Sequence, residues 1–122
     1  MLVVDDSLTT RRNITLTLQK FGYQVIQAGD GREALDQLKF HPQINAVLSD
    51  VEMPNMNGFE FLSQCRKEHP KDKLPVIMLT SRSGQKHQQI AQALGANIYL
   101  TKPYLEQDLR NALESCLEAI PC

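Results

Sequence analysis

The sequence predicts an α/β domain built on an open parallel sheet, with its functional residues at one edge of that sheet. Short apolar runs alternate with amphipathic segments of about 10–15 residues, which is the pattern of repeated β/α units. Polar side chains follow several of the apolar runs directly. Because ligands bind outside the carboxyl ends of the strands in such sheets, the residues after each run are the candidate site.

The first β/α unit begins with the apolar run Leu2-Val3-Val4, which predicts a buried strand over residues 2–5. Ser7 is a suitable N-cap for the helix that follows. That helix would bury Ile14, Leu18 and Phe21, which are spaced i, i+4 and i+7. Gly22 can adopt the left-handed conformation that ends helices, so we expect the helix to stop there.

The second unit begins with a strand at residues 24–28, and Gly29-Asp30-Gly31 predicts a turn after it. The next helix would bury Ala34, Leu35 and Leu38. His41-Pro42 ends this helix, because proline cannot continue a helical hydrogen-bond pattern. The third strand is predicted at residues 46–49.

The third and fourth helices differ in character. Asn57-Gly58 precedes a helix that would bury Phe59, Leu62 and either Cys65 or Arg66, and His69-Pro70 ends it. The fourth strand is predicted at residues 75–79. Residues 84–94 predict a mostly polar helix that stops at Gly95.

The last unit begins with a strand at residues 98–101. Proline is favoured in the first turn of helices, so Pro103 predicts the start of a final helix. The buried face of this helix would contain Leu105, Leu109, Leu113 and either Cys116 or Leu117. The chain thus provides five β/α units, without repeats or linkers.

Length and composition exclude several functions. A chain of 122 residues has the size of one domain, so we expect a single domain over residues 1–122. Its 13 basic and 14 acidic residues give a net charge of −1 with no block of Lys or Arg, which argues against binding to nucleic acid. The apolar runs are far shorter than the roughly 20 residues needed to span a bilayer. We therefore expect a cytoplasmic protein that does not insert into membranes.

The cysteines do not predict a disulfide framework or a zinc site. Cys65, Cys116 and Cys122 are odd in number and widely spaced, with no C-x-x-C pair. We expect Cys65 and Cys116 to act as small apolar core residues and Cys122 to lie in the tail.

Three acids follow two of the predicted strands. Asp5 and Asp6 end the first apolar run, and Asp50 ends the third. Carboxylate oxygens at adjacent strand ends suit a small divalent cation, Mg²⁺ above all. Without a cation the three would repel one another, and at least one pKa would rise. The structural alternative is that two of these acids cap helices.

A hydroxyl and an ammonium follow two further strands and complete a possible phosphoryl-transfer site. A carboxylate such as Asp50 can be a covalent nucleophile toward phosphorus. Lys102 and the Thr80 hydroxyl could then neutralise the oxygens of the phosphoryl group. Lys102 taken alone could equally be an exposed loop lysine, because a lysine before a helix-starting proline is common.

In this order, the residues resemble the motifs of response regulator receiver domains of two-component signalling, and the likeness covers the whole chain. The matching residues are Asp5-Asp6, the phosphoacceptor position Asp50, Met53-Pro54, Asn57-Gly58, Thr80, Tyr99 and Lys102-Pro103. The resemblance implies a flavodoxin-like, doubly wound sheet of five parallel strands in the order 2-1-3-4-5, with five helices. It also implies a cis peptide bond between Lys102 and Pro103.

The resemblance further implies how such a site would work. Mg²⁺ (or Mn²⁺) would be held by the side chains of Asp6 and Asp50 and the backbone carbonyl of Glu52, with Asp5 acting mainly through water. Asp50 would take a phosphoryl group from a phosphohistidine of a histidine kinase or a histidine phosphotransfer domain. A receiver of this kind phosphorylates and dephosphorylates itself and is a switch rather than a turnover enzyme.

The switch implied by the resemblance runs from Thr80 to Tyr99. It would alter the surface formed by the 84–94 helix, the 98–101 strand and the final helix, which could also support a weak dimer. From spacing alone, Tyr99 reads as a strand aromatic with its hydroxyl in water. Glu52 and Arg82 each lie two residues beyond a site residue, and we expect them to set the lifetime of the acyl phosphate. The alternatives are that both are simply solvated or that Arg82 contacts a partner kinase.

Within the family, residues 81–87, Leu94-Gly95-Ala96 and residues 99–104 resemble the receiver at the C-terminus of chemotaxis-type hybrid histidine kinases. We therefore expect this domain to be excised from a longer protein, with kinase modules in the same chain.

Three other functions compete with the receiver. A Mg²⁺-dependent aspartyl-phosphate phosphohydrolase would resemble Asp-x-Asp at the first strand end, whereas Asp50 follows the third strand. A flavodoxin-type binding module would need a hydroxyl- and glycine-rich phosphate loop after the first strand, where Asp5-Asp6 would repel phosphate. A pseudo-receiver that only docks proteins would not need the full set of acceptor-site residues.

Overall fold

The structure, a computed structural model, describes residues 1–81 and 84–118. A five-stranded parallel sheet has the order β2-β1-β3-β4-β5, as predicted. The strands are β1 (Leu2–Val4), β2 (Ile26–Ala28), β3 (Val47–Ser49), β4 (Val76–Thr80) and β5 (Ile98–Thr101). The helices of the described residues are α1 (Leu8–Lys20), α2 (Gly31–Phe40), α3 (Gly58–Glu68), α4 (Gln85–Ala93) and α5 (Glu106–Glu118).

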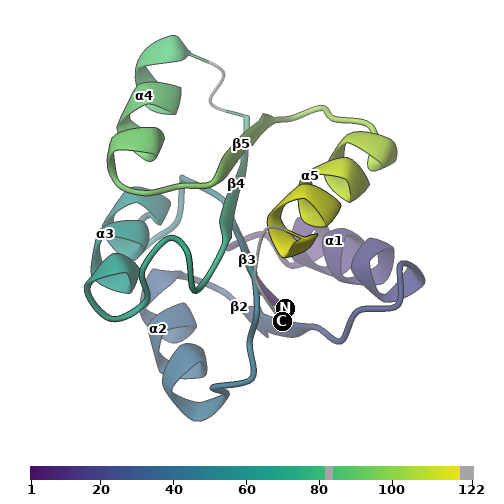
Figure 1. Cartoon of the computed structure of the whole chain (residues 1–122), viewed down its shortest axis with the longest axis horizontal. Helices are drawn as coiled ribbons and strands as arrows, with labels where there is room; N and C mark the ends of the chain where they lie inside the picture. Colours follow the sequence, from purple (N-terminus) through teal and green to yellow (C-terminus); the bar gives the residue numbers. More distant parts are fainter. Residues whose placement is uncertain (82–83, 119–122) are drawn as a thin grey trace.

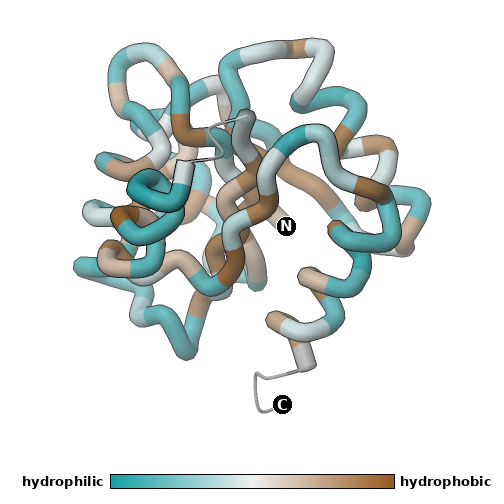
Figure 2. The backbone as a smooth tube through the Cα atoms, turned by 90° about the horizontal axis from the view of Figure 1, so that it is seen from above, coloured by the Kyte–Doolittle hydropathy of each residue, from teal (hydrophilic) through white to brown (hydrophobic). Residues whose placement is uncertain are grey.

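Helices cover both faces of the sheet, so the predicted doubly wound arrangement is confirmed. Figure 1 shows α1 and α5 on one face and α2, α3 and α4 on the other. Two apolar clusters fill the space between sheet and helices, one on each face. In Figure 2, hydrophobic residues gather along the chain in the middle of the molecule, and hydrophilic residues predominate along its outer parts. Within residues 1–81 and 84–118, no helix is long and apolar enough to cross a membrane.

The predicted helix starts and stops are largely confirmed. The Ser7 side chain caps α1 by accepting from the backbone N–H of Thr10. Asn57 caps α3 in a reciprocal capping box with Glu60. The glycines that end α1 and α4 have positive φ, 98° at Gly22 and 102° at Gly95, which few other residues adopt easily.

The strands differ from the predicted ranges at their ends. The first strand stops at Val4 because the Asp5 side chain accepts from the Ser7 N–H at 2.9 Å and turns the chain. The second strand begins at Ile26, which pairs with Leu2 at the start of β1. The third begins one residue later than predicted, at Val47. The fourth is shifted by one residue and includes Thr80, which pairs with Thr101.

The prediction that Pro103 opens the final helix is wrong. The Lys102–Pro103 bond is cis, as the resemblance implied, and α5 begins three residues later, at Glu106. The Asp108 carboxylate accepts from the Leu105 N–H at 3.2 Å, so the Asp108 side chain caps the start of the helix and Leu105 precedes it. The Leu105 side chain is 71% exposed and does not belong to the buried face.

The other predicted core positions are mostly buried. Ile14, Leu18, Ala34, Leu38, Leu62, Leu109 and Leu113 lie in the core, and Cys65 and Cys116 are buried there as free thiols. Phe61 of α3 is also fully buried, although the predicted face contained Phe59 instead. Cys122 lies outside the described residues.

Arg66, at the end of α3, joins loops on the edge of the sheet opposite the candidate site. Its guanidinium donates to the carbonyls of Gly95, His69 and Leu74 and to the side-chain oxygen of Asn97, at distances of 2.7–3.0 Å. A fork of five N–H donors suits several acceptors at once. Arg66 therefore fixes the chain just after α4 to the end of α3.

Candidate functional site

The strand register brings the predicted site residues to one edge of the sheet. Val4 of β1 pairs with Ser49 of β3, so Asp5 and Asp50, the next residues, leave the sheet side by side. On β4 and β5, Thr80 pairs with Thr101, and Lys102 follows directly. The backbone N–H of Lys102 donates to the Thr80 carbonyl at 2.7 Å.

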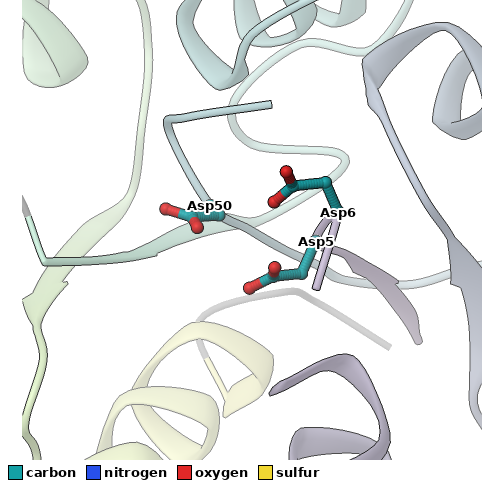
Figure 3. A group of neighbouring side chains, drawn as sticks. All are labelled: Asp5, Asp6 and Asp50. Atoms are coloured by element: carbon teal, nitrogen blue, oxygen red, sulfur yellow. The ribbon is translucent and has the colours of Figure 1, made fainter. Parts of the chain in front are cut away.

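The three predicted carboxylates form one cluster. Asp5, Asp6 and Asp50 can each offer an oxygen such that all three oxygens lie within 4.8 Å of one another. Figure 3 shows their side chains gathered between the ends of β1 and β3. Asp5 is buried, Asp50 is partly buried and Asp6 is exposed, so the cluster is open to solvent on one side.

Two of these carboxylates are held by backbone groups. Asp5 Oδ1 accepts from the Ser7 N–H at 2.9 Å. Asp50 Oδ1 accepts from the Val51 N–H at 2.7 Å, which leaves Oδ2 facing the ammonium of Lys102. The Lys102 Nζ lies 3.8 Å from Asp50 Oδ2 and 3.4 Å from Asp5 Oδ2. One ammonium therefore contacts both strand-end acids.

The charge of the cluster fits a divalent cation. The Lys102 ammonium offsets only part of the charge of three carboxylates, and burial raises the pKa of Asp5 above its usual range. The N–H of Ser7 and the charge of Lys102 oppose this rise. A set of hard oxygens with excess negative charge and one open side is what Mg²⁺ prefers, because it keeps several of its waters.

The raised pKa of Asp5 predicts a pH dependence that metal should reverse. An acid whose pKa is higher in the folded state stabilises the fold below its unfolded pKa of about 3.9, and this contribution is lost as pH rises through the folded pKa. In EDTA, the Asp5→Asn variant should therefore gain stability relative to the parent as pH rises above about 4. Urea unfolding at several pH values measures this. Saturating Mg²⁺ should favour the parent instead; a constant difference at all pH values would contradict the prediction.

Of the four residues predicted to act in the switch or in rate tuning, the structure describes three. Thr80 is fully buried at the end of β4. Tyr99 is partly buried and packs against the cluster on the α2, α3 and α4 face, so its ring is not simply solvated. Glu52 is exposed, two residues after Asp50. Arg82 lies outside the described residues.

Sequence reasoning missed some residues that support the site. Arg11 of α1 donates to the Asp5 carbonyl at 2.8 Å and to the Gln27 side chain at 3.0 Å, so it ties the first acidic loop to β2. Asn55 has a φ of +65° and donates to the Asp30 carboxylate at 2.8 Å. The turn chemistry of Asn55 was a possible signal, but the partner 25 residues away was not visible in the sequence.

Known proteins resemble this chain along nearly its full length. The family model described as "response regulator receiver domain" matches residues 1–114. A chemotaxis protein CheY homolog of Campylobacter jejuni is 38% identical over 118 residues, covering 96% of this chain and 91% of that protein. The sensor histidine kinase CheAY of Helicobacter pylori is 34% identical over 119 residues, covering 97% of this chain but 15% of the kinase.

Solved structures also resemble this chain along most of its length. Vibrio cholerae chemotaxis protein CheY4 superposes with a TM-score of 0.86 at 37% identity, covering 94% of this chain and 95% of that one. A CheX-CheY-BeF₃-Mg²⁺ complex from Borrelia burgdorferi matches with a TM-score of 0.88 at 29% identity, covering 95% and 87% of the two chains. With the same strand order, a matching family model and matching relatives, this chain belongs to the response regulator receiver domain family.

Proposed function

We propose that this receiver domain takes a phosphoryl group onto Asp50 from the phosphohistidine of a histidine kinase or a histidine phosphotransfer domain. The observation that carries this proposal is that Asp50 clusters with two other acids and also faces Lys102, whose Nζ lies 3.8 Å from Asp50 Oδ2. Receiver domains interact with histidine kinases and bind Mg²⁺ at an acidic pocket.

In the proposed transfer, a carboxylate oxygen of Asp50 forms a bond to phosphorus while the bond from phosphorus to the donor imidazole breaks. The imidazole nitrogen keeps the electron pair and takes a proton from water. Lys102 is near enough to Asp50 to pair with a phosphoryl oxygen, and the Thr80 hydroxyl would donate to another. Such transfer depends mainly on positioning and charge neutralisation.

We assign the metal to the side chains of Asp6 and Asp50 and the backbone carbonyl of Glu52, with Asp5 acting through water. Mg²⁺, or Mn²⁺ in its place, would neutralise phosphoryl oxygens. Two findings support the assignment: the three acids lie within reach of one ion, and the Borrelia burgdorferi complex contains both Mg²⁺ and BeF₃.

The proposal is tested by phosphorylation with a small donor. Acetyl phosphate and Mg²⁺ should add one phosphoryl group, seen by intact mass spectrometry and removed by hydroxylamine, as acyl phosphates are. EDTA in place of Mg²⁺ should abolish the addition. A phosphorylated histidine kinase should label the same site. Addition that is equal in EDTA and Mg²⁺ would rule out the metal-dependent mechanism.

We further propose that phosphorylation alters the surface of α4, β5 and α5 through Thr80 and Tyr99. A phosphoryl oxygen would draw the Thr80 hydroxyl toward Asp50 and free space for the Tyr99 ring, which shifts a two-state population. Beryllofluoride should therefore change NMR shifts around Tyr99 as well as at Asp50, and Thr80→Ala should confine the changes to the acceptor site. Changes confined to the acceptor site in the parent would exclude the coupling. A weak dimer through the same surface would strengthen on phosphorylation.

Glu52 and Arg82 are proposed to control the lifetime of the acyl phosphate. Water must reach phosphorus in line with the Asp50 oxygen, and long side chains near the site could obstruct or orient it. We expect Glu52→Ala, Arg82→Ala and the double variant to change the dephosphorylation half-life more than twofold and non-additively. Half-lives within twofold of the parent would remove this role.

One of the relatives supports a proposal about the longer protein to which this domain would belong. The match to part of the CheAY kinase supports a proposal that residues 1–122 form one domain beside kinase modules, acting in the cytoplasm where such kinases expose their phosphohistidine. Membership of the receiver family weighs against a phosphohydrolase, and the complete acid and lysine set weighs against a pseudo-receiver. Undetectable labelling by every phosphodonor would favour the pseudo-receiver.

A further inference from the structure

We propose that Asp30 is a positioning residue for the metal site, acting through Asn55 on the loop that joins β3 to α3. This inference rests on the proposed assignment of Mg²⁺ to Asp6, Asp50 and the Glu52 carbonyl. The hydrogen bonds of the Asp30 side chain go to Glu33 and Asn55 and not to these ligands. Asp30 lies in the loop between β2 and α2, at the same edge of the sheet but separated from β3 by β1 in the strand order.

The Asp30 carboxylate makes two contacts with different purposes. Its Oδ1 accepts from the Glu33 N–H at 2.9 Å and so caps α2. Its Oδ2 accepts from the Asn55 side-chain amide at 2.8 Å. One carboxylate therefore joins the rigid start of α2 to the loop that follows the phosphoacceptor. Both donors lower the pKa of Asp30, so it is an acceptor at neutral pH.

Asn55 sits where the loop needs an external anchor. Its φ of +65° is tolerated by asparagine but carries some strain, and Asn55 itself is exposed. The two ends of the loop are joined by the Gly58 N–H, which donates to the Val51 carbonyl at 2.7 Å. Just after Asn55, the Met56 carbonyl accepts from the Gly31 N–H at 3.2 Å. The side chains of Met53 and Met56 also pack against the core, and the Asp30 contact adds a polar anchor at Asn55.

The position of the Glu52 carbonyl depends on the path of this loop. Asp50 is held in the sheet by its own N–H, which donates to the Val4 carbonyl at 3.0 Å, whereas Glu52 lies in the exposed segment that follows. Groups that orient metal ligands without touching the metal commonly change affinity by about 10–100-fold when removed. Loss of the Asp30 contact should therefore weaken Mg²⁺ binding with little effect on the fold.

Three variants separate the contact from the helix cap. Asp30→Ser keeps a capping oxygen, as Ser7 provides for α1, but is too short to reach Asn55. Asn55→Gly keeps the positive φ and removes the donor. Asp30→Asn keeps the cap, and its amide can donate to the Asn55 oxygen once the Asn55 amide rotates, so it is the conservative control.

The experiment measures the Mg²⁺ dissociation constant by calorimetry and, separately, urea unfolding in EDTA. We expect Asp30→Ser and Asn55→Gly each to weaken Mg²⁺ binding about tenfold, and the double variant to be no weaker than either single one. Asp30→Asn should stay within about threefold of the parent. The free energies of unfolding in EDTA should not rank the variants in the order of their Mg²⁺ affinities.

The outcomes separate this inference from the function on which it rests. A parent protein that does not bind Mg²⁺ would overturn the proposed metal site. A parent that binds Mg²⁺, with Asp30→Ser and Asn55→Gly within twofold of it, would overturn the role of Asp30 alone. Additive losses in the double variant would also overturn it, because the two residues would then act separately.

Discussion

Asp50→Ala should take up no phosphoryl group from acetyl phosphate or from a phosphorylated kinase, while the parent takes up one. The variant lacks the carboxylate that, in the proposed transfer, forms the bond to phosphorus. We do not expect Asp5 or Asp6 to replace Asp50 as the acceptor. Asp5 is buried, accepts from the Ser7 N–H and pairs with Lys102. Lys102 pairs with Asp5 and Asp50, and no ion pair to Asp6 is found among residues 1–81 and 84–118. The measurement is intact mass under Mg²⁺.

The loss of labelling should not be a loss of folding. Removing one of three neighbouring carboxylates relieves repulsion in the absence of metal, so the urea midpoint in EDTA should stay the same or rise. Asp36→Ala is the matched control, since it removes an exposed carboxylate from α2 and should be labelled like the parent. Undiminished labelling of Asp50→Ala would show that another residue accepts the phosphoryl group.

Gly58→Ala should destabilise the domain by about 3 kcal/mol or more, the upper end of the range for overpacked sites. A Cβ at this position would lie 2.1 Å from the Asp50 carbonyl oxygen and 2.8 Å from Val51 Cα. Both are backbone atoms, so no side-chain rotation can remove the overlap. The start of α3 must move away from the acceptor strand, and the better helix propensity of alanine, about 1 kcal/mol, does not compensate.

Urea unfolding of Gly58→Ala beside Gly29→Ala measures this effect. A Cβ on Gly29 meets the Glu33 carboxylate at 3.4 Å and Arg11 at 3.6 Å, which are ordinary contacts. Gly29→Ala should therefore stay within about 0.5 kcal/mol of the parent. Equal stability of the two variants would show that the approach of α3 to Asp50 is looser than the structure indicates. Where Gly58→Ala still folds, its Mg²⁺ affinity should also fall.

The central part of the site could be predicted from the sequence because it depends on one repeated rule. Asp5, Asp50 and Lys102 each follow an apolar strand, and parallel strands bring their carboxyl ends to one edge. Local patterns also predicted the helix cap at Ser7 and the start of a helix after Asn57-Gly58, because a helix start depends on residues within one turn.

Other features depend on contacts that no local pattern contains. The start of α5 at Glu106 follows from a bond between Leu105 and Asp108 that competes with the general preference for proline in a first turn. Arg66 was an alternative member of a buried face, but its guanidinium reaches four partners outside its helix. The Asp30–Asn55 contact spans 25 residues of sequence. Such contacts can be identified only from the three-dimensional structure of the loops.

The contacts of Arg66 leave α4 unequally secured at its two ends. The carbonyl of Gly95, just past its last turn, accepts two guanidinium N–H groups. At the other end, Gly84 provides no side-chain cap, and the first turn contains no acidic residue to favour the helix dipole. The first turn does contact α3, where the His87 ring stacks on Phe59, but the hydrogen bonds of Arg66 make the last turn the more firmly anchored end. That first turn is also the end nearest in sequence to Thr80, so the proposed switch would act on α4 at its less firmly anchored end.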